Sequence, residues 1–309
     1  MYHLVHIPFI LMTNHLSSGP RVLIAAPVSN RHSHLLDKWI KHLEQLDYPN
    51  IDVCLVDNTE ENDDYFNKIK TLKVKGKNII TWKHNWDPKN RHPLQMLADV
   101  REDIRKYFTA HTEYDFLFWL DQDIFIPKWG VQRLLSYNKD LVGFYVHVFP
   151  KGQHKPCILK SGNVFLGGGL DYYTFGEIDA YKRFVAKYKA QKLSPEEKLL
   201  VPFIIKEKLK PQLFETYWVG LGCLMCSRKV SEIVPFLTHP TLIWGEDLWY
   251  ASAVNDKGFR VFCDTTIRPQ HLNCDWSSVV KKSPQIMNFY VAQGPVESKE
   301  AVIIDRRKK

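Results

Sequence analysis

The stretch Tyr114-Asp-Phe-Leu-Phe-Trp-Leu-Asp-Gln-Asp123 runs from an apolar segment straight into two carboxylates. A continuous apolar run without alternation is typical of a strand that is buried on both faces of a parallel sheet. The run therefore predicts a central strand, with Asp121, Gln122 and Asp123 following at its carboxyl end.

On both sides of this strand, strand patterns alternate with helix patterns. Apolar runs predict further strands at 21–27, 51–56, 78–82 and 140–148. Apolar side chains at intervals of three and four residues predict helices at 35–46 and 97–108. This alternation predicts the α/β fold class, with a Rossmann-like, doubly wound and mostly parallel sheet that carries helices on both faces.

A Lys-rich amphipathic stretch interrupts the alternation and predicts a helical insertion at 177–214. We expect an N-terminal segment at 1–20, a main domain at 21–275 that contains the insertion, and a C-terminal extension at 276–309. The extension ends in a basic tail, which we expect to be loosely attached to the domain.

Lysine and arginine number 42 against 34 aspartates and glutamates, which gives a net charge of +8 and a pI near 9.0. Such a balance favours anionic partners, and a nucleotide diphosphate, an anionic lipid surface or a nucleic acid would each fit. A basic, solvated face without a partner explains the charge equally well. The composition therefore narrows the class of partner without naming one.

The six cysteines lie mostly in apolar runs, which predicts buried free thiols in a reducing compartment. The apolar stretch at 4–12 is shorter than the roughly 20 residues that span a bilayer. It also lacks the basic flank and the cleavage site of a signal peptide. We therefore expect a cytoplasmic protein that is soluble or peripheral to a membrane, without a signal peptide or a transmembrane helix.

Polar clusters follow three of the predicted strands at the points where the strands end. The clusters are Pro27–Arg31, Asp57–Thr59 and Asp121–Asp123. In open α/β sheets the ligand lies beyond the carboxyl ends of the strands, so the three clusters should meet at one rim. The first cluster contains no glycine, which disfavours the Gly-rich phosphate loop of a sugar-phosphate nucleotidyltransferase.

The Asp-x-Asp motif gains its weight from its position, because a chain with this aspartate content contains about one such motif by chance. In extended chain, residues two apart point the same way, so Asp121 and Asp123 could share one hard cation while Gln122 points elsewhere. Carboxylate oxygens beside a pyrophosphate suit Mg²⁺ or Mn²⁺. A pair of turn-forming aspartates at a strand end is the alternative interpretation.

Other polar residues could complete a reaction centre, and each also has a purely structural interpretation. Glu246 and Asp247 open a predicted helix, where a carboxylate could act as a general base or simply be favoured by the helix dipole. His271 follows the last predicted strand and could be a nitrogen ligand beside Asp123, or a structural histidine. Asp57 could accept hydrogen bonds from a ribose or a base, or simply start a loop.

Cys223 and Cys226 have the spacing of a zinc-binding pair, but they lie in a predicted strand. Residues three apart in a strand face opposite sides, so the two thiols could not share an ion. The sequence has no second close cysteine pair, and this also argues against a structural zinc site.

Segments 26–30, 56–58, 119–123, 218–222 and 245–247, followed by His271, carry a family resemblance in their order and spacing. Together they resemble the GT-A glycosyltransferases, especially the family 2-like inverting enzymes, over most of the chain. The stretch 22–57 and the Asp-x-Asp strand also resemble, more weakly, the fungal mannan-polymerase type of mannosyltransferase.

The resemblance implies a GT-A catalytic domain that uses Mn²⁺ or Mg²⁺ and a UDP- or GDP-sugar. The donor contacts that it implies are Pro27, Asn30, Asp57, Asn58, Asp121, Gln122, Trp218, Gly220 and Gly222. The metal contacts that it implies are Asp123, Asp121 and His271. Glu246 would hold the acceptor, and Asp247 would be the catalytic base.

Two features depart from the family pattern. The arginine-rich segment before the Asp-x-Asp strand is represented only loosely, by Arg91 and Arg101, which leaves the contacts to the donor diphosphate open. The insertion at 177–214 has no counterpart that we can assign.

The sequence thus predicts a metal-dependent glycosyltransferase of the hexosyltransferase class, which moves a sugar from a nucleotide-diphosphate donor to an acceptor hydroxyl with inversion. The acceptor stays open between a glycan, a lipid and a protein. We expect peripheral contact with a membrane to be compatible with this function. One alternative is a retaining GT-A enzyme, in which Asp247 would not be a base. Another is a non-catalytic protein that binds a membrane or a nucleic acid through its basic surface, with nucleic acid the less expected partner.

Overall fold

The computed structural model describes residues 19–60, 63–85, 93–144, 146–148, 155–156, 158–161, 171–172, 187, 190–192, 194–195, 213–237, 246–267 and 269–272. The helices are η1 Asn30–His32, α1 Ser33–Glu44, α2 Asp64–Ile69, α3 Pro93–Ala110, α4 Gly130–Ser136, α7 Arg228–Ile233 and α8 Glu246–Asp256. The first strands are β1 Val22–Val28, β2 Ile51–Asp57, β3 Ile79–Lys83, β4 Phe116–Leu120, β5 Ile124–Phe125, β6 Leu141–Phe144 and β7 His147–Val148. The later strands are β8 Lys155–Pro156, β9 Ile158–Ser161, β10 Asp171–Tyr172, β11 Leu213–Thr216, β12 Trp218–Val219, β13 Cys223–Ser227, β14 Val261–Asp264 and β15 Gln270–His271.

Eight strands form the main sheet, in the order β11-β14-β6-β13-β4-β1-β2-β3. The run from β4 to β3 is parallel throughout, and β14 lies parallel to β6. β13 runs antiparallel between β4 and β6, and β11 runs antiparallel beside β14. The predicted α/β fold class is confirmed, as a mixed and mostly parallel sheet with β4 near its centre.

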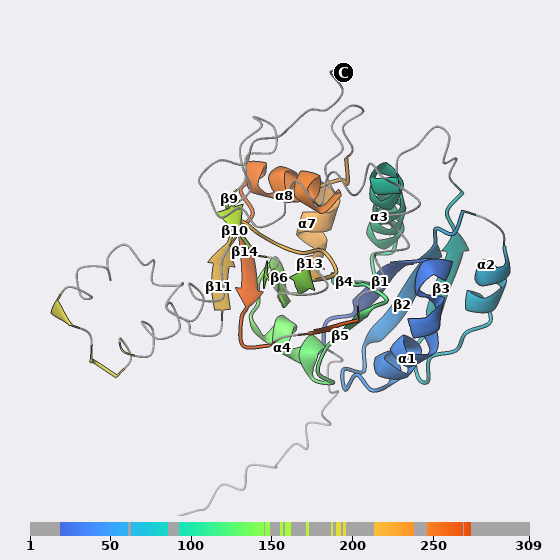
Figure 1. Cartoon of the computed structure of the whole chain (residues 1–309), viewed down its shortest axis with the longest axis horizontal. Coiled ribbons are helices and arrows are strands. Elements are labelled where there is room, and N and C mark those ends of the chain that lie inside the picture. Colours follow the sequence, from blue (N-terminus) through green and yellow to red (C-terminus); the bar gives the residue numbers. More distant parts are fainter. Residues whose placement is uncertain are drawn as a thin grey trace, which may run out of the picture.

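The sheet is covered on both faces, because successive residues of a strand point to opposite sides. Leu23 and Ala25 of β1 pack with α3, α7 and α8, whereas Ile24 and Ala26 pack with α1, α2 and α4. Figure 1 shows the first group of helices above the sheet and α1 and α4 below it. The doubly wound arrangement that the sequence predicts is therefore present.

The two cysteines of β13 follow the same rule. Cys226 is buried in the layer of α3, α7 and α8, and Cys223 is buried in the opposite layer. Burial raises the pKa of both thiols far above its usual range. Both therefore behave as core residues, and each faces away from the other.

Arg228, the first residue of α7, fixes the carboxyl end of α3. Its guanidinium donates hydrogen bonds to the carbonyl oxygens of Phe108, His111 and Tyr114 at 3.2, 2.7 and 2.6 Å. A cation is favoured at this end of a helix because the helix dipole places partial negative charge there. α3 is thereby held against the sheet, and its middle turn carries Arg101 toward the rim.

Three smaller sheets accompany the main one: β10-β9-β12, β15-β5 and β7-β8. In the β15-β5 ladder, His271 pairs with Ile124, the residue that follows Asp123. This antiparallel ladder brings the end of the described chain back to the Asp-x-Asp motif.

The predicted insertion at 177–214 lies mostly outside the described residues, as does the predicted C-terminal extension at 276–309. The prediction that the insertion stays helical to residue 214 is wrong, because residues 213–214 belong to strand β11, which pairs with β14. Among the helices that the structure describes, none has the length and apolar composition needed to cross a bilayer.

Candidate active site

The loops after β1 and β2 meet at the carboxyl edge of the sheet, where Val28 lies beside Asp57 in the parallel register. The Asn30 amide donates to Thr59 Oγ1 at 2.9 Å, and the Asn58 amide donates to the Val28 carbonyl at 2.9 Å. Asp57 is completely buried, and its Oδ1 accepts from the Thr59 amide at 2.9 Å. Among the described residues, its Oδ2 is buried without a hydrogen-bond partner. An orphaned carboxylate oxygen thus lies in this part of the site.

The Asp-x-Asp motif forms a turn, closed by a hydrogen bond from the Ile124 amide to the Asp121 carbonyl at 3.0 Å. The extended geometry that we expected for residues 121–123 is therefore wrong. As a result the two carboxylates have different partners. Asp121 is hydrogen-bonded to Arg101 of α3, and Asp123 lies against His271 of β15.

Gln122, the middle residue of the turn, is buried and ties two loops together. Its Nε2 donates to the His32 carbonyl at 3.0 Å and to the Tyr65 hydroxyl at 2.9 Å. Its Oε1 is buried and finds no hydrogen-bond partner in the part of the chain that the structure describes. Gln122 therefore connects the loop after β1 with α2, and it leaves a second unpaired acceptor close to the rim.

Two imidazoles approach the carboxylate of Asp123. His271 Nε2 lies 3.1 Å from Asp123 Oδ2, and His32 Nδ1 lies 3.7 Å from the same oxygen. Burial lowers the pKa of His32, although the charges of Asp123 and Asp121 oppose the shift. His32 thus tends toward the neutral form, which is the form in which imidazole binds metal ions.

These donors fit a metal that binds together with a diphosphate. Within the described part of the chain, no three His, Cys, Asp or Glu side chains form a complete metal cluster. A hard cation that also uses phosphate and water oxygens needs only one or two protein ligands. The Asp123 oxygen and the His271 nitrogen supply such a pair, and Mn²⁺ accepts both oxygen and imidazole.

Arg101 occupies the centre of the site, although its side chain is only 4% exposed. Its Nη2 donates to the Asp121 carboxylate at 3.1 and 3.3 Å, and its Nε donates to Glu246 Oε1 at 3.3 Å. The guanidinium lies over the ring of Trp119, 5.1 Å from its centroid. Burial works against its charge, but Asp121 and Glu246 outweigh that effect and raise the pKa of Arg101.

Glu246 and Asp247 begin α8, as the sequence predicts. Burial raises the pKa of Glu246, with the charge of Arg101 opposing the shift. Burial and the negative charge of Glu246 together raise the pKa of Asp247 to about 7, and Arg101 again opposes. Asp247 keeps a partly exposed surface, whereas Glu246 is buried. The pair therefore combines an internal, ion-paired carboxyl with an accessible one that titrates near neutral pH.

Gly222 lies against the Asp-x-Asp turn, and its carbonyl accepts from the Asp121 amide at 3.0 Å. A Cβ at this position would meet Ile124 Cδ1 at 2.6 Å and Asp121 Oδ2 at 2.8 Å. Such distances are shorter than van der Waals contact, so only glycine lets the backbone approach the carboxylate this closely.

The other predicted donor contacts are distributed unevenly. Pro27 is half-buried at the end of β1, and Asn30 is exposed in η1. Trp218 is 1% exposed and packs edge-to-face on Tyr250, with the ring centroids 5.7 Å apart. Gly220 is also buried. The structure thus places Trp218 and Gly220 beneath the rim.

His42 of α1 supports the strand that follows the Asp-x-Asp turn, because its Nε2 accepts from the Ile126 amide at 3.2 Å. Burial lowers the pKa of His42 from 6.5 to about 4. The unfolded chain therefore binds this proton more readily than the folded chain between these two pH values. We expect the stabilisation to be complete above pH 6.5 and to be lost as the pH falls toward 4. Thermal midpoints of wild type and His42→Gln across this window should show a shallower slope for the variant, and equal slopes would contradict this role.

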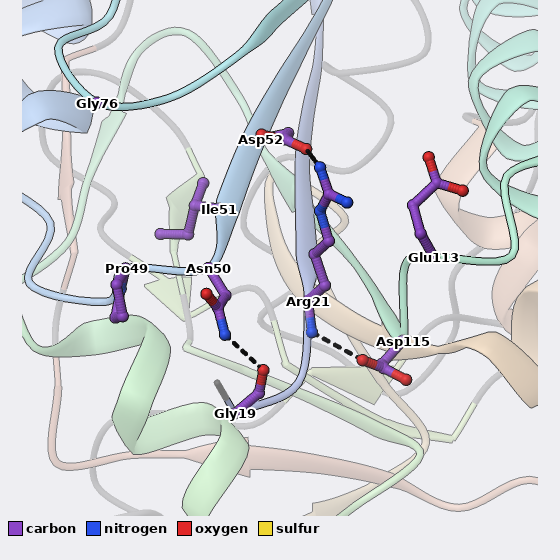
Figure 2. Close-up of a pocket in the computed structure, with 9 residues that line it drawn as sticks. All are labelled: Gly19, Arg21, Pro49, Asn50, Ile51, Asp52, Gly76, Glu113 and Asp115. Atoms are coloured by element: carbon purple, nitrogen blue, oxygen red, sulfur yellow. Dashed lines mark hydrogen bonds and ion pairs between the residues drawn. The ribbon is translucent and has the colours of Figure 1, made fainter. Parts of the chain in front are cut away.

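A cavity of about 440 Å³ lies at the opposite edge of the sheet, where β1 and β2 begin. Figure 2 shows Arg21 pointing to Asp52, with Glu113 and Asp115 on the side of Arg21 that lies away from Asn50. Asp52 also accepts from the Tyr114 hydroxyl at 2.8 Å, and Asp115 accepts from the Arg21 amide at 2.7 Å. These contacts join the starts of three strands, and the cavity lies away from the carboxyl edge that carries the rim.

Two residues of the site were not predicted from sequence as site residues in their own right. His32 lies one residue beyond the first polar cluster, so extending that cluster would have included it. Arg101 appeared only as a weak counterpart of an arginine-rich segment. Its spacing from Leu97 and Ile104 places it on α3, but no sequence signal indicates that it reaches Glu246.

No protein-family model matches the sequence, and no curated protein matches it. Among solved structures, the chain is similar to A197 from STIV, with 14% identity and a TM-score of 0.39, over 82% of this chain and 86% of that one. It is also similar to TarS from S. aureus, with 10% identity and a TM-score of 0.47, over 91% of this chain but only 40% of TarS. Likenesses at this level say nothing about the activity of this chain.

Proposed function

We propose that the chain is a metal-dependent glycosyltransferase that transfers a sugar from a nucleotide-diphosphate donor to an acceptor hydroxyl. The observation that carries the proposal is the pairing, at one edge of an α/β sheet, of an Asp123–His271 couple with an accessible carboxyl of near-neutral pKa. The first suits a diphosphate-bound cation, and the second suits a general base. The order of the motifs along the sequence resembles that of GT-A enzymes and supports the same reading.

The nucleoside would lie over the loops after β1 and β2. Within the described ranges, Asp57 Oδ2 and Gln122 Oε1 are buried acceptors without partners, and each costs free energy until a donor group reaches it. A carboxylate only accepts hydrogen bonds, so Asp57 favours a ribose hydroxyl or a base edge that presents N–H groups. Uracil and guanine present a ring N–H on this edge, which is consistent with a UDP- or GDP-sugar, whereas the ring N3 of cytosine is an acceptor and only its exocyclic amino group donates.

Asp123 and His271 would hold Mn²⁺ or Mg²⁺, with Asp121 turned toward the donor sugar by its bond to Arg101. When bound, the cation neutralises charge on the departing nucleoside diphosphate. Gly222 lets the backbone pack closely against Asp121, so no side chain from this loop displaces that carboxylate. The net charge of +8 favours the anionic donor over a neutral one.

Asp247 would take the proton from the acceptor hydroxyl as that oxygen attacks the anomeric carbon. The C–O bond to the acceptor forms while the bond to the diphosphate oxygen breaks, and attack from the opposite face inverts the anomeric centre. A base is most effective when its pKa lies near the working pH, and the pKa of Asp247 is about 7. Product configuration by NMR would distinguish this inverting course from a retaining one.

The proposal is tested by a thermal-shift screen of UDP, GDP, ADP and CDP, each with Mn²⁺ and with EDTA. A ligand present at 100 times its dissociation constant stabilises the folded state by about 2.7 kcal/mol. We expect UDP or GDP to raise the thermal midpoint only with Mn²⁺, and the corresponding nucleotide-sugars to be hydrolysed slowly. The absence of any metal-dependent shift, together with salt-sensitive binding to DNA or anionic vesicles, would favour the non-catalytic alternative.

A further inference from the structure

Two carboxyl groups next to each other in a chain rarely do the same work, and the site contains such a pair in Glu246 and Asp247. In the described part of the chain, Glu246 is the member of the pair that hydrogen-bonds a cation, through Arg101 Nε at 3.3 Å. The same guanidinium also donates to Asp121, so one side chain contacts both edges of the site. Asp121 follows β4 and lies 20 positions from Arg101 in the sequence, whereas Glu246 opens α8 and lies 145 positions from it.

We propose that Arg101 is a positioning residue that joins the donor side of the site to the carboxyl pair of α8 and holds Glu246 as the ion-paired member. Asp247 is thereby left as the member that accepts the acceptor's proton. The role of Asp247 toward an acceptor rests on the proposed function. The electrostatic link between Arg101, Glu246 and Asp247 concerns only residues of this chain.

Burial and three contacts restrict the geometry of Arg101, while its Nη1 is buried without a hydrogen-bond partner among the described residues. Its side chain is 4% exposed, its Nε and Nη2 are engaged by two carboxylates, and its plane lies over Trp119. A planar guanidinium can serve two carboxylates at fixed angles, whereas an ammonium group is a point charge. Movement of Glu246 away from Arg101 would leave a buried charge without its partner, which is strongly unfavourable. Arg101 therefore fixes where α8 begins relative to the Asp-x-Asp turn.

The charges around the pair support a division of labour. Arg101 from α3 and Asp121 from the end of β4 act on Glu246, and Arg101 and Glu246 act on Asp247. Arg101 lowers the pKa of Glu246 through both its charge and a hydrogen bond, but it lowers the pKa of Asp247 through its charge alone. A charged Glu246 then raises the pKa of its neighbour. Both pKa values are raised, and the direct hydrogen bond to Arg101 is what distinguishes Glu246 from Asp247.

The proposal predicts opposite pH shifts for two substitutions. Arg101→Met removes the positive charge, so the acid limb of the turnover profile should move up by about one pH unit or more. Glu246→Gln removes the negative neighbour of Asp247, so the same limb should move down by about one pH unit. Arg101→Lys keeps the positive charge but lacks the planar guanidinium. It should return the acid limb of the pH profile to its wild-type position, while kcat stays below that of wild type. The assay is hydrolysis of the UDP- or GDP-sugar with Mn²⁺, with water as the acceptor.

Arg105→Met is the matched control. Arg105 lies one turn further along α3, pairs with Glu102 at 2.7 Å, and donates to the Ser231 carbonyl at 2.6 Å. Its loss should lower the thermal midpoint without moving the pH profile. If Arg101→Met and Arg105→Met share the wild-type acid limb, the proposal is overturned.

A second measurement requires no turnover. Arg101→Met should leave the buried acidic groups without their cation, so its thermal midpoint should rise relative to wild type as the pH falls from 8 to 6. Adding Glu246→Gln to Arg101→Met should recover part of the lost stability at pH 8. If melting of Arg101→Met follows that of Arg105→Met at every pH, Arg101 does not set the charge of the pair. If the melting results hold but wild type hydrolyses no donor, the proposed function fails and the electrostatic link stands.

Discussion

Replacing Asp247 by asparagine is expected to lower sugar transfer by about 10²- to 10⁴-fold, the usual contribution of a positioned general base. Asparagine has nearly the same shape as aspartate, so α8 should begin at the same place, but its amide cannot take a proton at neutral pH. The affinity for a nucleoside diphosphate with Mn²⁺ should stay unchanged, because Asp247 has no part in the proposed metal pair. Single-turnover rates and calorimetric titration measure the two quantities separately.

Asp256→Asn is the appropriate control, since Asp256 lies at the other end of the same helix. It should transfer sugar at the wild-type rate. Normal transfer by Asp247→Asn would contradict its assignment as the base. A retaining outcome in the product, together with residual activity, would instead favour the alternative mechanism.

Replacing Asp123 by alanine should remove the metal-dependent part of donor binding, with a loss of about 10- to 100-fold in affinity. The reason is that Asp123 provides the carboxylate oxygen of the proposed metal pair, and His271 alone offers a single neutral ligand. Titration of the nucleoside diphosphate with Mn²⁺ and with EDTA measures the loss. In the variant, the two curves should nearly coincide.

Asp115→Ala serves as the control, because Asp115 lies just before the other end of β4 and accepts a hydrogen bond from the Arg21 amide. We expect it to lower stability modestly while the Mn²⁺ dependence of donor binding persists. Retention of full Mn²⁺ dependence by Asp123→Ala would remove Asp123 from the metal site and leave Asp121 as the candidate.

The sheet was largely predictable because buried parallel strands have a simple signature. β1 and β4 are continuous apolar runs, β2 is apolar from Val53 to Val56, and all three lie where the sequence predicts them. The antiparallel direction of β13 was not predictable, since an apolar run carries no information about direction. That direction decides which end of the strand meets Asp121, through the Gly222 carbonyl.

The carboxyl edge was predictable as a meeting place but not in its internal contacts. Asp57 ends β2 and Asp123 follows β4, and these two strands flank β1 in the sheet. The predicted orientation of Asp121 was wrong, because the chain that we expected to be extended forms a turn. Asp and Asn favour turns because their side chains hydrogen-bond to nearby backbone. The contact between Arg101 and Glu246 was not predicted, because it depends on how α3 packs against α8. The spacing of apolar residues within one helix does not determine that packing.

The β5–β15 ladder determines when, during synthesis, the chain becomes able to bind a cation. It joins Asp123 to His271 across 148 positions, and contacts of such separation form late, once the intervening chain has folded. A nascent chain that has already completed β1 to β4 would hold Asp57 and Asp121 in place but would lack the imidazole. The ability to take up a cation with its nucleotide would then arise with the last strands, which would spare the unfinished chain from trapping either one.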